Sequence, residues 1–441
     1  MSLATRFDIE MRAPGRLKPF SGNARRHSRK QVQQIANSIR RFGFTNPVLV
    51  SDEGEIIAGH GRVEAAKLLG LESVPTLKLS HLSEPERRAY VLADNKLALN
   101  AGWDQEVLAF ELQALVDLDF DVSLTGFSPA EIDLTLEAAR DANAKSRGDR
   151  ADEVPALAKD AVSRPGDVWV LGRHRVICGD ARRREVYDQL LEGEKVDLIF
   201  TDPPYNVAID GNVTGKGLVT HREFAMGAGE MSKADFIDFL TVTLRAQARC
   251  AREGAIAFVA MDWRHMGELL AAGTEVFSEL KNLCVWNKTN AGLGSFYRSK
   301  HELVFVFKVG QGPHTNTFGL GAEGRYRTNV WDCAGVSGGG RARAEALAMH
   351  PTVKPVALVA DAIRDCSRRG DTVLDGFGGS GTTLIAAEQC GRAARLIEID
   401  PLYVDTIVRR FERVTGKDVT LAGNGATFDE VEEARITEDI G

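Results

Sequence analysis

The chain has 441 residues, a length that corresponds to two or three domains with at least one sizeable hydrophobic core. Its 44% hydrophobic and 27% charged residues are ordinary for a globular protein, which excludes wholesale disorder and fibrous repeats. A net charge of −7 excludes a uniformly basic nucleic-acid-binding coat but leaves room for a local basic face. The longest apolar run, residues 254–261, is too short to cross a bilayer, and six widely spaced cysteines predict reduced thiols in a cytoplasmic protein.

The first 103 residues predict a small α/β domain that begins with a basic arm. Residues 1–50 carry ten Lys and Arg against two Asp and Glu. Apolar spacing predicts helices over 28–42 and 63–69 and strands over 46–50, 55–58 and 74–79. Gly59-His60-Gly61-Arg62 lies between a strand and a helix, and we expect it to form a tight loop.

Residues 104–164 form an acidic segment. Fourteen Asp and Glu oppose five Lys and Arg between 104 and 160. Apolar residues at helical spacing predict helices up to about residue 139, and the polar stretch from about 141 to 164 predicts a linker. The chain also ends in an acidic tail, residues 429–441.

Strands and helices alternate from residue 165 to 428. This alternation predicts a doubly wound, mostly parallel sheet with both faces covered by helices. Strands are expected over 168–171, 175–178, 196–201, 255–261, 285–288, 302–308, 372–374 and 394–399, and helices over 233–250 and 382–390.

Two motifs follow expected strands. The first, residues 375–383, reads Asp-Gly-Phe-Gly-Gly-Ser-Gly-Thr-Thr and opens a helix, so its backbone can approach a ligand and its N–H groups can face negative oxygens. About twenty residues later, Glu398-Ile-Asp400 ends the next strand, where an acid can accept hydrogen bonds from ribose hydroxyls. The second motif, Asp202-Pro203-Pro204-Tyr205, ends a buried strand at the edge where open α/β sheets bind ligands. The glycine pattern alone also fits an NAD-dependent dehydrogenase or a turn without a ligand.

Together the two motifs resemble those of the S-adenosylmethionine-dependent DNA amino-methyltransferases, over about residues 166–417. The Asp-Pro-Pro-Tyr motif precedes the glycine loop, an order similar to that of the permuted beta group. The resemblance implies a Rossmann-like methyltransferase domain over 165–428, with a target-recognition region over 286–349. It also implies double-stranded DNA as substrate, base flipping, S-adenosyl-L-methionine as cofactor and no metal.

The same resemblance implies roles for individual residues. Residues 202–205 are the expected catalytic motif, and Glu398 is the expected ribose acid with Asp400 as the alternative. Cofactor contacts are implied for Asp180, Ala181, His350, Thr352, Lys354, Asp375, Phe377, Gly378, Ser380, Gly381, Thr382, Glu398 and Asp400. DNA contacts are expected in a basic, aromatic loop at Lys288, Tyr297, Arg298 and Lys300. One departure from the family is Gly376, where proline is usual.

The chemistry of an exocyclic base amine fits the second motif. Asp202 and the carbonyl of Pro203 can accept the two N–H bonds of the amine, and Tyr205 can stack on the flipped base. The chain has no Pro-Cys pair, which argues against C5-cytosine methylation, and Asp-Pro-Pro-Tyr has no role in hydride transfer. Adenine N6 is favoured because this motif is commonest among adenine enzymes; cytosine N4 is the alternative.

The N-terminal domain has a resemblance of its own, carried by residues 46–67. It looks like the ParB-N/sulfiredoxin superfamily, in which a loop between a strand and a helix cradles nucleotide phosphates. Gly59, His60 and Arg62 are the corresponding loop here, although His60 and Gly61 replace the usual Glu and Arg. A further alternative is therefore a nucleotide-gated DNA-binding protein with an inactive methyltransferase half. The resemblance implies a protein of bacteria, phages or mobile elements that lies with the nucleoid, takes part in restriction-modification or DNA protection, and is compatible with a homodimer.

Overall fold

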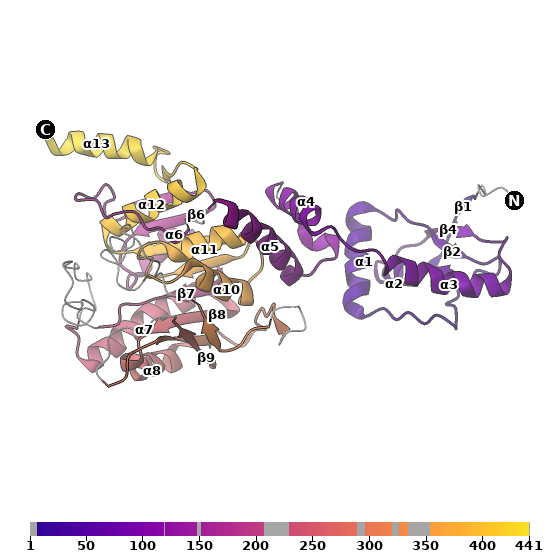
Figure 1. The fold of residues 1–441 in the computed structure, drawn as a ribbon, viewed down its shortest axis with the longest axis horizontal. Helices are drawn as coiled ribbons and strands as arrows, with labels where there is room; N and C mark the ends of the chain where they lie inside the picture. The colour runs from indigo at the N-terminus through magenta and orange to yellow at the C-terminus, as the bar shows by residue number, and fades with distance from the viewer. Residues whose placement is uncertain are drawn as a thin grey trace. The chain divides into compact units, whose positions relative to one another are not determined.

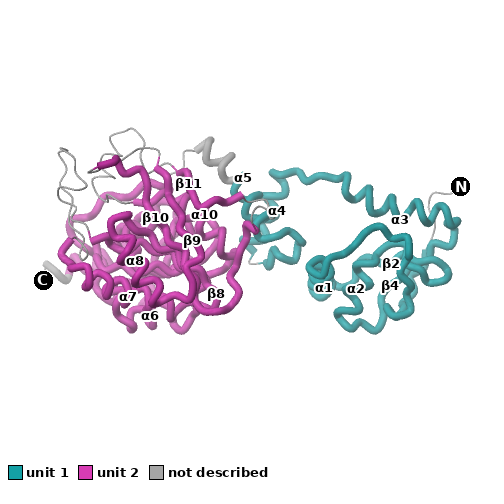
Figure 2. The backbone as a smooth tube through the Cα atoms, turned by 90° about the horizontal axis from the view of Figure 1, so that it is seen from below, with its two compact units in different colours: residues 1–141 teal, residues 142–441 magenta. Residues whose placement is uncertain are grey.

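The computed structural model describes residues 7–118, 120–147, 151–206, 229–288, 296–319, 326–333 and 353–440, and of residues 140–147 and 438–440 only the backbone. The chain divides into two compact units, residues 1–141 and 142–441 (Figure 2). Within the described parts, no helix is long and apolar enough to span a membrane.

The first unit contains a four-stranded sheet in the order β1-β4-β2-β3 (Figure 1). Its strands are β1 (Ile9–Arg12), β2 (Val48–Val50), β3 (Ile56–Ala58) and β4 (Val74–Lys78). Strand β1 was not expected because it lies at the sheet edge with largely exposed side chains, so it carries no apolar alternation. The expected strands at 46–50, 55–58 and 74–79 are confirmed.

The helices of this unit begin at local capping signals. Helix α1 (Arg29–Phe42) follows the short η1 (Pro14–Arg16) and starts at Ser28, whose hydroxyl accepts from the Gln31 amide. Helix α2 (His60–Leu68) starts directly after Gly59, whose φ of 105° suits glycine. The expectation of a tight loop over residues 59–62 is therefore wrong, because His60 to Arg62 form the first turn of α2. Helix α3 (Glu84–Ala98) was not expected, since it buries only Val91 and shows no apolar stripe.

A small separate core follows in the acidic segment. Helices α4 (Gln105–Asp117) and α5 (Pro129–Arg147), with η2 (Val122–Thr125) between them, bury Ala109, Leu112, Ile132 and Leu136 against one another. Helix α5 runs eight residues beyond the expected end at 139, because the polar residues after that point still favour helix.

Residues 151–163 were expected to belong to a linker, yet they pack on the second unit. Ala151 and Val162 are buried in its main core. The Val162 and Ser163 amides donate to the Asp405 carboxylate at 2.6 and 2.9 Å, and this carboxylate is fully buried. The polar composition was misleading because several contacts of this segment are made by backbone groups, which residue type does not reveal.

The second unit is built on a ten-stranded sheet in the order β11-β9-β10-β8-β7-β12-β13-β6-β5-β14. The strands are β5 (Val168–Leu171), β6 (His174–Cys178), β7 (Val196–Thr201), β8 (Ala251–Met261), β9 (Glu279–Asn287), β10 (His301–Lys308), β11 (Val330–Asp332), β12 (Thr372–Asp375), β13 (Ala393–Glu398) and β14 (Thr420–Leu421). The central strands β8, β7, β12, β13 and β6 are parallel, as expected. Antiparallel pairs of β8 with β10, β10 with β9, β6 with β5 and β5 with β14 extend the sheet on both sides.

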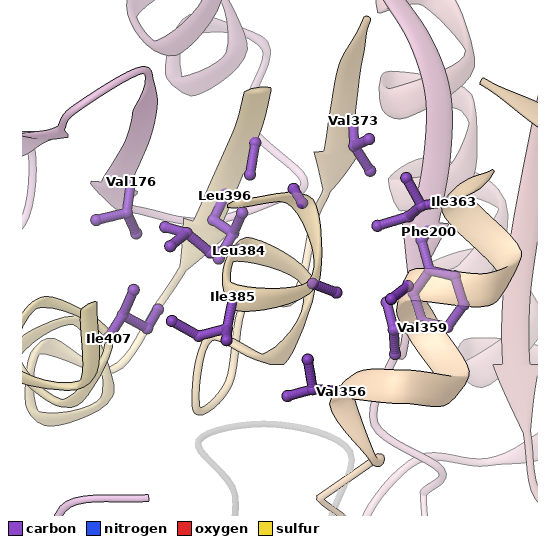
Figure 3. Packing of buried hydrophobic residues seen from close by; sticks show 14 of the residues in the cluster. Val176, Phe200, Val356, Val359, Ile363, Val373, Leu384, Ile385, Leu396 and Ile407 are labelled. Atoms are coloured by element: carbon purple, nitrogen blue, oxygen red, sulfur yellow. The ribbon is translucent and has the colours of Figure 1, made fainter. Parts of the chain in front are cut away.

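Helices cover both faces of this sheet, which confirms the doubly wound α/β architecture. Helices α10 (Val356–Cys366), α11 (Thr382–Cys390), α12 (Pro401–Thr415) and α13 (Phe428–Ile440) contribute to one core. Helices α6 (Arg184–Leu191), α7 (Lys233–Cys250) and α8 (Met266–Val276), which follows η3 (Trp263–His265), contribute to the other. Figure 3 shows the first core, where Leu384 and Ile385 of α11 lie between Leu396 of β13 and Ile407 of α12.

Candidate active site

The two sequence motifs meet where the chain order of the sheet reverses. Strand β7 is followed by β8 on one side, whereas its other neighbour, β12, is followed by β13 in the opposite direction. Ligands bind at such a switch point in open α/β sheets. A hydrogen bond joins the two strand ends, because the Thr201 hydroxyl donates to the Asp375 carboxylate at 3.1 Å. The motif at 202–205 and the loop at 376–381 therefore leave the sheet side by side.

The side chain of Asp375 is bound by other groups of the protein interior. Its carboxylate accepts from Thr201, from the Phe377 amide at 3.0 Å and from the Thr383 hydroxyl at 2.6 Å. Burial raises the pKa of Asp375 to about 7. These contacts join β7, the glycine loop and the first turn of α11, so Asp375 shapes the loop from behind.

The glycine loop is also held from its buried side. The Gly378 amide donates to the Ile397 carbonyl at 2.8 Å, and a Cβ at this glycine would lie 3.3 Å from both Leu396 and Ile407. Gly381, with a φ of 83°, precedes α11. The guanidinium of the fully buried Arg410 donates to the Ser380 carbonyl at 2.8 Å and lies 3.3 Å from the Thr382 hydroxyl. The loop is therefore fixed before any ligand arrives.

The departure at Gly376 has a structural reason. The Gly376 amide donates to the Gln247 side-chain oxygen of α7 at 3.2 Å. A Cβ at position 376 would lie 2.7 Å from the Gln247 nitrogen. Proline would lose this donor and collide with the buried amide, so Gly376 and Gln247 depend on each other.

Glu398 lies at the end of β13, next to the loop. Its two oxygens accept from the Gly379 amide at 2.7 Å and the Asp400 amide at 2.9 Å. The side chain is buried, and burial raises its pKa to about 7. Asp400, the alternative ribose acid, uses one carboxylate oxygen to cap α12 through the Leu402 amide at 3.0 Å. Glu398 therefore contacts the glycine loop directly, whereas Asp400 caps the next helix.

The end of β6 completes a row of three neighbouring strand ends. The Gly179 amide donates to the Glu398 carbonyl at 2.8 Å, which brings Asp180 and Ala181 beside β13. The Asp180 carboxylate is paired with Arg182, and the Ala181 carbonyl accepts from the Tyr187 hydroxyl at 2.8 Å. The expected adenine and ribose contacts thus lie next to the glycine loop.

A compact network surrounds the carboxylate of Asp202. Lys354 Nζ donates to Asp202 Oδ2 at 2.5 Å, and the Tyr205 hydroxyl donates to Oδ1 at 2.7 Å. Glu302, at the start of β10, lies 3.2 Å from both the Tyr205 hydroxyl and Lys354 Nζ. Lys288, at the end of β9, donates to the other oxygen of Glu302. Lys354 and Glu302 are buried, whereas a quarter of the Asp202 side chain is exposed.

The charges of this network stabilise one another. Burial by itself would raise the pKa of Glu302, but Lys354 and Lys288 hold that pKa at about 2. Burial would lower the pKa of Lys354, but Asp202 and Glu302 raise it. Burial raises the pKa of Asp202 and Lys354 opposes that shift. Lys354 and Glu302 are therefore both charged at neutral pH.

Several expected site residues have partners within the protein. Lys354, an expected cofactor contact, donates to Asp202, and Lys288, an expected DNA contact, binds Glu302 and lies 4.6 Å from the Trp286 ring. Tyr297, Arg298 and Lys300 are exposed, as DNA contacts require. The centre of the Phe377 ring lies 6.0 Å from the centre of the Phe239 ring. His350, Thr352 and much of the expected target-recognition region lie outside the described residues.

Sequence reasoning missed Glu302. The only local signal is an acid directly before the apolar strand run Leu303–Phe307, and many surface strands begin in this way. Among the described residues, no group of three or more His, Cys, Asp or Glu side chains could hold a metal ion.

The nucleotide loop expected in the first unit lies at the start of α2. His60 accepts from the Phe20 amide at 3.3 Å, and burial lowers its pKa. The Arg62 guanidinium is largely buried behind Gly59, and its Nε has no hydrogen-bond partner among the described residues. Burial lowers the pKa of Arg62, partly offset by Asp94.

Comparison with known proteins identifies both units. Residues 196–409 match the DNA methylase family of N6 and N4 methyltransferases. The second unit therefore contains a DNA methylase domain of the N6/N4 type. Residues 10–96 match the ParB N-terminal domain, which confirms the second resemblance, and residues 106–165 match the ParB-methyltransferase HTH domain, which the sequence analysis did not foresee.

Individual proteins are similar to either unit. The ParB-like nuclease domain-containing protein YnaK of Escherichia coli K12 is 46% identical over 86 residues, which are 20% of this chain and 99% of that protein. The type II methyltransferase M.HinfI of Haemophilus influenzae is 26% identical over 242 residues, 51% of this chain and 65% of that protein. Among solved structures, the crystal structure of M1.HpyAVI in complex with SAM is similar, with a TM-score of 0.40. The two sequences are 20% identical, and the match covers 53% of this chain and 97% of M1.HpyAVI.

Proposed function

We propose that this protein transfers a methyl group from S-adenosyl-L-methionine to an exocyclic amine of a base in duplex DNA, with adenine N6 favoured over cytosine N4. The observation that carries the proposal is the position of Asp202 and Tyr205 at the switch point, directly beside the glycine loop. The preference for adenine rests on the Asp-Pro-Pro-Tyr motif itself. The basic side chains of residues 7–50 support DNA as the partner, since Arg16, Lys18, Arg26, Arg29, Lys30, Arg40 and Arg41 are exposed.

The residues at the strand ends fit the proposed cofactor. S-adenosyl-L-methionine supplies an electrophilic methyl group on a positively charged sulfur. Glu398 can accept from ribose hydroxyls, and Asp180 lies where the adenine contacts are expected. The carboxylate of Asp202 and the carbonyl of Pro203 accept the N–H bonds of the target amine. This pairing directs the nitrogen lone pair toward the methyl group, so positioning and charge supply most of the rate.

Methylation of a plasmid in cells tests the proposal. Single-molecule sequencing of that plasmid maps the modified base, the atom and the sequence motif together. N6-methyladenine is the expected product. N4-methylcytosine would show that cytosine is the target base. An unmodified plasmid would favour a DNA-binding protein with an inactive methyltransferase half. Calorimetry with S-adenosyl-L-methionine then separates that last case, because an inactive half that has lost its cofactor site would not bind.

Cofactor affinity should depend on pH through Glu398. The pKa of this acid is raised to about 7, so protonation below that pH removes charge and acceptor capacity from the ribose site. If the ionised form binds, the affinity falls by up to about tenfold for each pH unit below 7. Calorimetry across roughly pH 5.5 to 8.5 measures this slope.

The Glu398→Gln variant is the matched control for that slope. It should bind more weakly at pH 8 and show a flatter dependence on pH. Any dependence left in the variant reports Asp375, whose pKa is also about 7. An unchanged slope in Glu398→Gln would assign the titration to Asp375 and contradict the role of Glu398.

We further propose that the ParB domain binds a ribonucleoside triphosphate at the start of α2. The buried Arg62 Nε without a partner supports an anionic ligand there, since an unpaired buried donor is costly. Arg62→Ala should weaken nucleotide binding about tenfold or more, because a hydrogen bond to a charged group contributes roughly 1.5–3 kcal/mol. Calorimetry with ATP, GTP, CTP and UTP measures this, and Arg88→Ala, an exposed arginine of α3, is the control. Equal binding by both variants would place the nucleotide elsewhere.

A further inference from the structure

Lys354 is already bound to the carboxylate of Asp202 that the proposed chemistry needs as an acceptor. Its Nζ donates to Asp202 Oδ2 at 2.5 Å, and this carboxylate is the expected acceptor for the target amine. Lys354 is only 3% exposed, so the contact belongs to the interior of the site and is not a surface ion pair. An amine that arrives at Asp202 therefore competes with an ammonium group already bound there.

A second carboxylate lies within reach of the same ammonium. Glu302 Oε2 is 3.2 Å from Lys354 Nζ and 3.2 Å from the Tyr205 hydroxyl. Glu302 is itself fixed by Lys288, which extends from the neighbouring strand β9 and binds its other oxygen. Lys354 thus lies between two acids, and the Tyr205 hydroxyl lies within hydrogen-bond distance of the same two acids, with the shorter contact to Asp202.

The balance of charge explains why both acids are needed. Two lysines and two carboxylates form a cluster with no net charge. If Lys354 left Asp202 and had no other carboxylate beside it, a buried ammonium group would remain unpaired, which is strongly unfavourable. Glu302 removes this obstacle, because Lys354 can transfer its hydrogen bond to Glu302 without leaving the cluster.

We propose, on the basis of the methyltransferase function above, that Glu302 is a positioning residue that receives Lys354 when the target amine binds Asp202. The exchange breaks the Lys354–Asp202 hydrogen bond, strengthens the Lys354–Glu302 contact and forms the bond from the amine to Asp202. No proton or covalent bond is transferred. The Tyr205 hydroxyl lies within hydrogen-bond distance of both acids and can donate its one proton to either during the exchange.

Glu302→Gln tests the proposal. The variant keeps the shape of the side chain and removes its charge, so Lys354 stays on Asp202 and competes with the amine. We expect kcat to fall at least tenfold and KM for DNA to rise, while the Kd for S-adenosyl-L-methionine changes less than threefold. Glu302→Asp should recover part of the loss. Glu279→Gln is the matched control, since it removes an exposed charge from the far end of the same hairpin and should behave as wild type.

A double variant separates this exchange from a structural role. In Glu302→Gln/Lys354→Met the competing ammonium is gone, and Lys288 and Asp202 remain with balanced charge. The double variant should be more active than Glu302→Gln alone, whereas a structural role predicts additive losses. Additive losses, or a Glu302→Gln variant with wild-type kcat and KM, would overturn the inference. An inactive wild-type protein would instead refute the proposed function, and the inference with it.

Discussion

Replacement of Asp202 by alanine is expected to abolish methyl transfer and leave the fold intact. Asp202 is the only acid in the motif, and its carboxylate is the proposed acceptor for the target amine. Loss of such a group lowers the rate by about 10²–10⁴-fold. The fold should tolerate the change because Lys354 keeps Glu302 as its charged partner. Transfer of a labelled methyl group to DNA measures the rate, and circular dichroism checks the fold.

Asp188→Ala provides the comparison for this variant. Asp188 is an exposed acid of α6 in the same unit, and it pairs with Arg184 on the helix surface. It should retain normal turnover. Near-normal turnover in Asp202→Ala would show that the amine is held elsewhere, and the assignment of the catalytic motif would have to be abandoned.

The second large effect concerns the segment before the methyltransferase sheet. The sequence predicts a linker over about residues 141–164, and a linker could be removed without loss of cofactor binding. In the structure, Val162 and Ser163 supply both hydrogen bonds to the buried Asp405, and the Ala151 carbonyl accepts from the buried Arg410 at 2.7 Å. A protein of residues 164–441 would lose all three contacts.

We therefore expect residues 151–441 to fold and bind S-adenosyl-L-methionine, and residues 164–441 to be several kcal/mol less stable. Each buried polar group left unsatisfied costs about 1–3 kcal/mol, more when it is charged, and typical domains have only about 5–15 kcal/mol in total. Arg410 also contacts Ser380, so cofactor affinity should fall together with stability. Urea unfolding and calorimetry on the two truncated proteins measure both quantities. Equal stability of the two would show that residues 151–163 contribute nothing to the domain.

The sequence by itself determined the elements whose signals are local. Helix α7 begins and ends as predicted, at Lys233 and Cys250, because apolar spacing and the Ser232 cap lie within the helix and its first flanking residue. Helix α11 follows from Gly381 before it and Gly391 after it. The motif at 202–205 and the loop at 376–381 could also be recognised in the sequence, because their chemistry depends on residue type and on their position after a strand. Parallel strand order then places both at one edge of the sheet.

Only the tertiary structure decided which charged groups meet. Lys354 and Asp202 are 152 positions apart, and Tyr205 and Glu302 are 97 apart, so no local pattern links them. Glu302 looks like an ordinary acid before a strand until β9 and β10 bring Lys288 beside it. The same holds for residues 151–163, where the backbone amides of Val162 and Ser163 bind Asp405 and their side chains give no sign of it. Burial turns these distant groups into obligatory partners, because an unpaired charge or polar group in the interior is too costly to remain.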